Sequence, residues 1–128
     1  MEDKLTKKLT VKKENLASYV GSGRLDVLAT PAVAALMEGA AAELAQSKLE
    51  SDEFTTVGTA ISIEHTSPTP LGAEVEATAV LTKTEGRMFY FELTARDNSG
   101  EIARGTHTRV SVSADKFQKK ADAKFDQV

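Results

Sequence analysis

Residues 30–48 read TPAVAALMEGAAAELAQSK, and this stretch decides the fold class. Thr30 is a good N-cap, and Pro31 suits the first position of a helix. Apolar residues then recur at the i, i+3, i+4 and i+7 spacing of one helical face, while alanines fill the reverse side. Because a helix that is apolar all round is normally buried, we expect a long central helix that other parts of the protein cover.

The sequence on either side of this helix shows the period of two that is typical of strands. A weakly alternating edge strand is predicted at residues 4–11, and four longer strands at residues 53–65, 74–83, 88–96 and 101–113. These elements predict an α+β fold in which a curved antiparallel sheet lies against the helix. The alanine-rich side of the helix would remain open, which suggests that a second subunit covers it.

Length and composition narrow the class of protein. The chain has 128 residues, a net charge of −3 and no cysteine. We expect one domain over residues 1–128, with a charged tail at about 118–128 that frays or forms a short exposed helix. The lack of cysteine fits a cytoplasmic location, the acidic balance argues against a nucleic-acid partner, and no apolar run is long enough to cross a membrane.

Two ionisable side chains fall where water should be scarce. Glu38 lies inside the apolar part of the predicted helix, among alanines. His65 ends its strand with the parity of Ile61 and Ile63, so it should point toward the helix. Burying such groups is costly unless they are paired or used in chemistry. The plainer alternatives are an ion pair at an interface edge for Glu38 and a satisfied core histidine for His65.

Four other residues have both a structural and a functional interpretation. Thr30 is a common cap, but a helix N-terminus also offers N–H groups to a developing oxyanion. Gly58 indicates either a strand bulge or the close approach of a ligand. Arg109 is most simply a solvated charge, although near a site it could hold a phosphate-bearing substrate. His107 has the opposite parity to Val110, so we expect it to be exposed or structural unless a bulge shifts the register.

The sequence lacks the common fingerprints of metal and nucleotide sites. Its two histidines have neither HxxxH nor HExxH spacing, and Gly21-Ser22-Gly23 lacks the rest of a phosphate-binding glycine motif. The GxSxG elbow of serine hydrolases is also missing. We therefore expect no metal site and no bound cofactor.

Three runs, TPAVAALMEGAA, VGTAISIEHTSPTPLG and GTHTRVSVSADKF, resemble the fluoroacetyl-CoA thioesterase family of hotdog-fold proteins. The resemblance implies a hotdog fold and a homodimer with sites at the subunit interface. It implies that Thr30, Glu38 and His65 are catalytic. It also implies that Gly58 and Arg109 contact an acyl-CoA substrate, with coenzyme A as part of that substrate and not a cofactor.

The function implied by this resemblance is an acyl-CoA thioesterase, which releases a free acid and CoA. Glu38 would act as nucleophile or general base, His65 would transfer the proton, and Thr30 would position Glu38 or the thioester oxygen. Residues 19–29 (YVGSGRLDVLA) are shorter than the family's lid and lack its phenylalanine, which favours broader acyl-CoA substrates over fluoroacetyl-CoA. The alternatives are a non-catalytic acyl-CoA-binding module and, more weakly, an enoyl-CoA hydratase.

Overall fold

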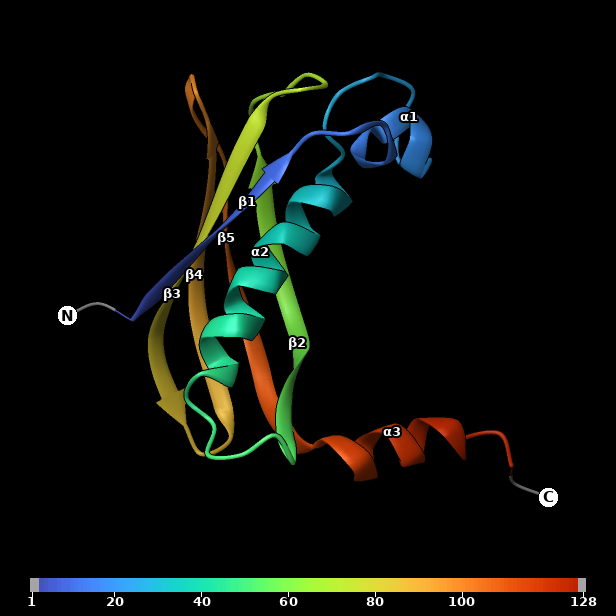
Figure 1. Cartoon of the computed structure of the whole chain (residues 1–128), viewed down its shortest axis with the longest axis vertical. Coiled ribbons are helices and arrows are strands. Elements are labelled where there is room, and N and C mark those ends of the chain that lie inside the picture. The colour runs from blue at the N-terminus through green and yellow to red at the C-terminus, as the bar shows by residue number, and fades with distance from the viewer. Residues whose placement is uncertain (1–2, 127–128) are drawn as a thin grey trace.

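A computed structural model describes residues 3–126 of the chain. The elements in chain order are β1 (Lys4–Thr10), a 3-10 turn η1 (Lys13–Asn15), α1 (Ala17–Val20), α2 (Thr30–Gln46), β2 (Phe54–His65), β3 (Glu74–Glu85), β4 (Met88–Asp97), β5 (Gly100–Ser113) and α3 (Ala114–Asp122). Figure 1 shows α2 lying along one face of a curved sheet, with α1 and α3 at opposite ends. The predicted α+β arrangement is confirmed.

The five strands form one antiparallel sheet in the order β1-β3-β4-β5-β2. β1 is an edge strand, as its weak alternation predicted. β2 is the opposite edge, and it pairs along its 12 residues only with β5. The outer edge of β2 therefore presents backbone N–H and C=O groups that this sheet does not use, which is a common site of pairing with another chain.

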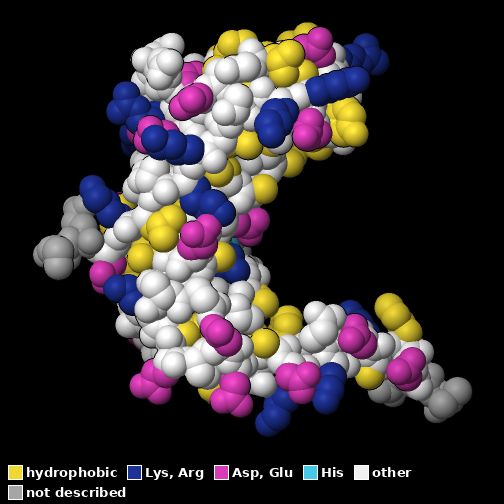
Figure 2. Space-filling view, in the orientation of Figure 1, with side chains coloured by type: hydrophobic (Ala, Val, Ile, Leu, Met, Phe, Trp, Pro, Cys, Tyr) yellow, Lys and Arg dark blue, Asp and Glu magenta, His cyan; other side chains and the backbone are white. Residues whose placement is uncertain are grey.

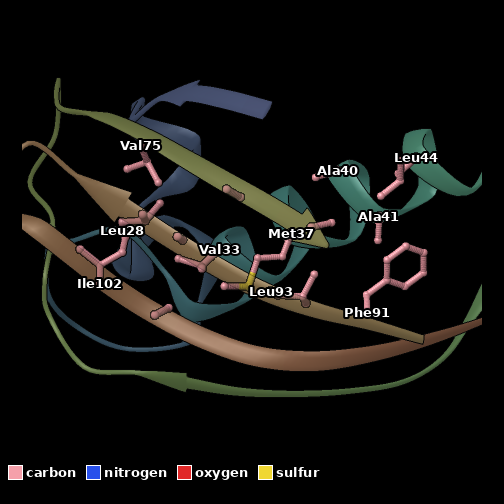
Figure 3. Close-up of a cluster of buried hydrophobic side chains, with 14 of the residues drawn as sticks. Leu28, Val33, Met37, Ala40, Ala41, Leu44, Val75, Phe91, Leu93 and Ile102 are labelled. Atoms are coloured by element: carbon pink, nitrogen blue, oxygen red, sulfur yellow. The ribbon is translucent and has the colours of Figure 1, made fainter. Parts of the chain in front are cut away.

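The core lies between α2 and the middle strands, as Figure 3 shows. Val33 and Met37 of α2 are fully buried, and they face Phe91 and Leu93 of β4. The alternation predicted for β4 therefore holds. Small alanines on α2 and β3 let the helix approach the sheet closely, so few aromatic residues are needed to fill the space between them.

The start and the reverse side of α2 differ from the prediction. Ala29 occupies the cap position and makes no side-chain cap bond, whereas Thr30 is already helical. The N-cap prediction for Thr30 is wrong because its hydroxyl has a different partner, described below. Ala35 is exposed and Ala34 is only half-buried, so one side of α2 is left open by the sheet.

The uniform alternation predicted for β2 is interrupted by a bulge. The register of β2 against β5 shifts at Thr59. Before the shift Gly58 lies opposite Arg109, and after it Ile61 lies opposite His107. Because directly opposed residues share a face of the sheet, all four of these side-chain positions lie on the side of α2. One inserted residue thus changes the face of everything that precedes it in the strand.

The last helix, α3, follows β5 directly and projects away from the sheet. Figures 1 and 2 show α3 and the α1 region projecting from the same side of the molecule, with a hollow outline between them. No side chain of α3 is buried. Within residues 3–126, none of the helices has the length and apolar character needed to cross a membrane.

Candidate active site

The N-terminal end of α2 meets the C-terminal end of β2 in a direct side-chain contact. Thr30 Oγ1 lies 2.7 Å from His65 Nδ1, which is a short hydrogen bond. The other ring nitrogen, His65 Nε2, is buried and has no hydrogen-bond partner within residues 3–126. A buried nitrogen without a partner is costly, so it needs a group from a substrate, a water or another chain. We call this contact the Thr30–His65 pair.

A hollow of about 280 Å³ adjoins the Thr30–His65 pair. It is formed by the segment that precedes α2 and by the loop that follows β2, and its lining includes Ala17, Val27, Thr30, His65 and Pro68. Typical ligand pockets measure about 300–1,000 Å³, so this hollow can hold only part of a large ligand such as an acyl-CoA. The remainder of the pocket must come from elsewhere.

A second group of polar side chains lies further along α2, around Gly58. A Cβ atom placed on Gly58 would be 3.1 Å from Glu38 Oε2, 3.1 Å from His107 Cε1 and 3.5 Å from Arg109 Nη1. The missing side chain therefore leaves the space into which a carboxylate, an imidazole and a guanidinium all point. We call these four residues, Glu38, Gly58, His107 and Arg109, the Glu38 cluster.

Arg109 is held rigidly in this cluster. It is only 8% exposed. Its Nε donates to Thr56 Oγ1 at 2.8 Å, and its Nη2 donates to the Thr56 carbonyl at 2.9 Å. Burial lowers the pKa of Arg109, and the attraction of Glu38 opposes this shift. The expectation of a solvated charge is wrong, because Arg109 faces α2 between Gly58 of β2 and Phe89 of β4, where Gly58 leaves room for its side chain.

His107 is buried as well, with 2% of its surface exposed. Its Nδ1 lies 2.7 Å from the Ala60 carbonyl, and its Nε2 lies 3.1 Å from Arg109 Nη1. Burial is the main cause that lowers the pKa of His107, and the charge of Arg109 acts in the same direction. The exposed position expected for His107 is therefore wrong. The register of β5 against β4 shifts at Ile102, so Ile102 and His107 are both buried although their parities differ.

One protomer does not bring all the predicted catalytic residues together. Thr30 and Glu38 are eight residues apart in α2, which corresponds to about 12 Å along the helix axis. Thr30 contacts His65, while Glu38 lies beside Gly58 and Arg109, and no hydrogen bond joins His65 to Glu38 within residues 3–126. A single chain thus carries two separate groups of polar side chains on one face of its sheet, called half-sites below.

The chemistry available to these half-sites is acid–base and electrostatic. An imidazole with a free nitrogen can exchange protons near neutral pH. A carboxylate can attack a carbonyl carbon or activate water, and a helix N-terminus and a guanidinium stabilise negative charge. Across residues 3–126, no three His, Cys, Asp or Glu side chains are grouped closely enough to hold a metal ion.

The sequence of this chain is similar to those of known proteins. Residues 11–115 match the family described as fluoroacetyl-CoA-specific thioesterase. The fluoroacetyl-CoA thioesterase of Streptantibioticus cattleyicolor is 38% identical over 99 residues, which is 77% of this chain and 70% of that protein.

Solved structures show the same fold. A point mutant of the fluoroacetyl-CoA thioesterase in complex with acetyl-CoA superimposes with a TM-score of 0.90 at 29% identity, over 97% of each chain. A hot-dog-like protein from Thermanaerovibrio acidaminovorans superimposes with a TM-score of 0.86 at 24% identity, over 97% of this chain and 91% of that one. The second likeness concerns the fold alone.

Proposed function

The chain belongs to the family of fluoroacetyl-CoA-specific thioesterases, and we propose that it hydrolyses acyl-CoA at a site that two copies of the chain build together. It is a thioester hydrolase with the hotdog fold. The observation that carries the proposal is the buried Nε2 of His65, which has no partner among the described residues 3–126. Thr30 holds the ring through Nδ1, beside the hollow.

In the proposed mechanism the two half-sites divide the work. Glu38 attacks the thioester carbonyl carbon or activates the water that does so. On the water route Glu38 takes a proton from the water, the C–S bond breaks after the water oxygen bonds to the carbonyl carbon, and a proton passes through His65 to the leaving sulfur of CoA. On the covalent route the C–S bond breaks as an acyl-Glu38 anhydride forms, His65 protonates the sulfur, and water then hydrolyses the anhydride and restores Glu38. The products are a carboxylic acid and CoA.

Thr30 holds the buried imidazole in orientation. The backbone N–H of Thr30, at the N-terminus of α2, stabilises the carbonyl oxygen as it gains negative charge, because Pro31 has no N–H and those of Ala32 and Val33 donate to the Ala29 carbonyl.

The substrate contacts follow from the shape of the Glu38 cluster. Gly58 leaves room beside the Glu38 carboxylate, and Arg109 directs a fixed positive charge at the same space. A thioester carbonyl or a phosphate oxygen of CoA would be attracted there. Residues 19–29 provide no phenylalanine over the hollow, and Tyr19 and Leu25 are largely exposed. We therefore extend the proposal to a range of acyl-CoA esters beyond fluoroacetyl-CoA.

In a homodimer, the Thr30–His65 pair and Glu38, which lie apart in one chain, are brought together. The free edge of β2 carries the exposed apolar side chains of Phe54 and Ile61, and the open side of α2 carries alanines. Two identical edge strands can pair antiparallel about a two-fold axis, because such an interface is self-complementary. If this pairing is offset toward the His65 ends, the His65 end of one β2 lies alongside the middle of the other. The Thr30–His65 pair of one protomer would thereby approach Glu38 of the partner subunit.

A hydrolysis screen tests the activity. Wild-type protein is incubated with acetyl-, fluoroacetyl-, medium-chain and aryl-CoA esters, and released CoA thiol is measured. Glu38→Gln and His65→Gln should each lower kcat/KM by roughly 10²-fold or more, since each removes a proton-transfer or nucleophilic group. Glu43→Gln, an exposed carboxylate on the same helix, is the control and should behave as wild type. Unchanged turnover in both site variants would remove the catalytic assignment.

Mixing the two inactive variants tests the shared site. A heterodimer of Glu38→Gln and His65→Gln protomers contains one site with both native residues if each site takes Glu38 and His65 from different chains. Statistical mixing after unfolding and refolding should then restore roughly a quarter of the wild-type activity. If each protomer used its own Glu38 and His65, the mixture would remain as inactive as the separate variants.

A further inference from the structure

The second histidine of the chain has both ring nitrogens engaged within the Glu38 cluster, and no role has been given to it above. We propose that His107 is a positioning residue, a neutral imidazole whose Nε2 accepts a hydrogen bond from Arg109 and fixes the guanidinium beside Glu38. The proposal rests on the proposed function for its kinetic effects, but its structural core can be tested without any activity.

The contacts determine the tautomer of His107. A carbonyl oxygen only accepts hydrogen bonds, so the 2.7 Å contact with Ala60 requires a proton on His107 Nδ1. Arg109 only donates, so the 3.1 Å contact at the other nitrogen requires a lone pair on Nε2. A charged imidazole would place two N–H donors, and two positive charges, against each other at this contact. The geometry therefore admits only the neutral ring with its proton on Nδ1.

The surroundings of His107 also favour the neutral ring. On its own strand it faces Arg109, and from α2 the carboxylate of Glu38 lies across the space at Gly58. From β2 the Ala60 carbonyl binds it, and from β4 the Phe91 ring lies 6.1 Å away between centroids. Burial and Arg109 lower the pKa of His107, while the Ala60 bond and Glu38 oppose them.

A neutral acceptor at this point settles the orientation of Arg109. A guanidinium has five N–H donors in one plane. Three of them are used by the Thr56 hydroxyl, the Thr56 carbonyl and His107 Nε2. The plane of the guanidinium is then fixed at three points, and its two remaining N–H groups are free for the carboxylate of Glu38 or an oxygen of the substrate. Without His107 the plane could rotate about the Thr56 contacts.

Kinetics of three variants test this role. His107→Phe keeps a flat ring but removes the acceptor, and we expect KM for the best acyl-CoA ester to rise roughly tenfold with a smaller change in kcat. His107→Gln supplies a carbonyl oxygen close to the position of Nε2 and should recover most of the loss. Thr108→Val is the matched control, because it removes a hydroxyl on the opposite face of the same strand that bonds Thr59 and not Arg109.

A double-mutant cycle separates positioning from packing. In an Arg109→Gln background, His107→Phe should change kcat/KM less than twofold, because the group through which it acts is already gone. Equal losses in the native and Arg109→Gln backgrounds would show that His107 merely fills space, and so would failure of His107→Gln to recover KM.

The tautomer itself is measured by NMR of the wild-type protein labelled with 15N on histidine. The proposal expects a His107 ring that is protonated on Nδ1 and not on Nε2 at neutral pH. A ring protonated on Nε2, or on both nitrogens, would overturn it. A protein that hydrolysed no acyl-CoA ester would refute the proposed function and leave this measurement intact, so the two failures can be told apart.

Discussion

The two histidines of this chain lie on neighbouring strands of one sheet and have opposite surroundings. His65 uses one nitrogen on Thr30, and the other is buried without a partner in the part of the chain that the structure describes. His107 has a partner at each nitrogen, Ala60 and Arg109. One imidazole therefore has a nitrogen available for reaction, whereas both nitrogens of the other are already hydrogen-bonded. The position of the histidine relative to the ends of its strand accounts for this difference.

His65 ends β2, where the loop that follows and the segment before α2 leave a hollow. His107 lies in the middle of β5, beneath α2, where every neighbour is packed against it. At a strand end a polar atom can be left for a ligand, whereas inside a sheet an unsatisfied polar atom would cost stability with no compensation. The Thr30–His65 pair therefore leaves a ring nitrogen available to a ligand, whereas the Glu38 cluster holds its side chains rigidly.

The largest effect is expected when a single methyl group is added inside the Glu38 cluster. Gly58→Ala would place a Cβ 3.1 Å from Glu38 Oε2 and from the His107 ring. Because His107 is held at both nitrogens, the Glu38 carboxylate must move, and we expect kcat/KM to fall by roughly 10- to 100-fold. The thioesterase assay with the best acyl-CoA ester measures this.

Gly39→Ala is the matched control for Gly58→Ala. Its new Cβ would meet only the flexible side chain of Lys7, at 3.5 Å, and it would favour the helix by about 1 kcal/mol. It should therefore keep its activity and unfold at the same or a higher temperature. Equal activity of the two glycine variants would mean that the Glu38 cluster tolerates displacement and is not a preorganised half-site.

A moderate effect is expected when the Thr30–His65 pair loses the hydrogen bond that orients the imidazole. Thr30→Val removes the hydroxyl that lies 2.7 Å from His65 Nδ1 while keeping the shape of the side chain. We expect kcat to fall roughly tenfold, because the imidazole loses one hydrogen bond that holds its ring. Thr30→Ser keeps the hydroxyl and should stay within about threefold of wild type. A kcat for Thr30→Val that matches Thr30→Ser would deny the hydroxyl any role.

The smallest expected effect concerns stability against pH. The pKa of His107 is lowered from 6.5, mainly by burial, so the unfolded chain binds a proton more readily than the folded one. The stabilisation is complete above about pH 6.5 and is lost as the pH falls below that value toward the folded pKa. Urea unfolding at a series of pH values should show this slope in wild type and a weaker one in His107→Gln.

The titration of Asp97 sets the lower end of the pH range for that experiment. Hydrogen bonds from Ser99 and Thr69 lower the pKa of Asp97 below 3.8, so its own contribution fades only in more acidic solution. Measurements kept above about pH 5 therefore exclude the contribution of Asp97, and the His107→Gln variant identifies the part that belongs to His107. Identical slopes for wild type and His107→Gln in this window would contradict the neutral, buried ring.

Part of the fold followed from local patterns alone. The apolar periodicity of α2 and the alternation of β4 predicted Met37, Phe91 and Leu93 as core residues, because burial repeats with the period of the element. The bulge at Thr59 was not predictable in the same way. Gly58 was a sign of a bulge, but a single extra residue leaves the composition of the strand unchanged while it reverses the faces, and the pairing with β5 fixes its position.

The candidate site, too, could be predicted from the sequence only in part. Chemistry-bearing residue types and their order in the chain indicated Thr30, Glu38 and His65, and their catalytic roles stay predictions, as do the homodimer and the cytoplasmic location. The contact between Thr30 and His65 agrees with a shared role, whereas Glu38 lies with partners that no spacing indicated. Counting parity from Val110 as an inward residue predicts an outer position for His107. The pairing of β5 with β4 is regular from Ala103 to Val110, and His107 and Arg109 are the residues that face α2.

The sequence by itself determined the order of elements, the buried helix with its acid and the family, since these depend on periodicity and on local motifs. Only the tertiary structure decided which polar groups meet. It joined Thr30 to His65, enclosed Arg109 and His107, and left one edge of β2 open. The physical reason is that hydrogen-bond partners and desolvation depend on distances between strands far apart in the chain, and these distances are set by register and packing.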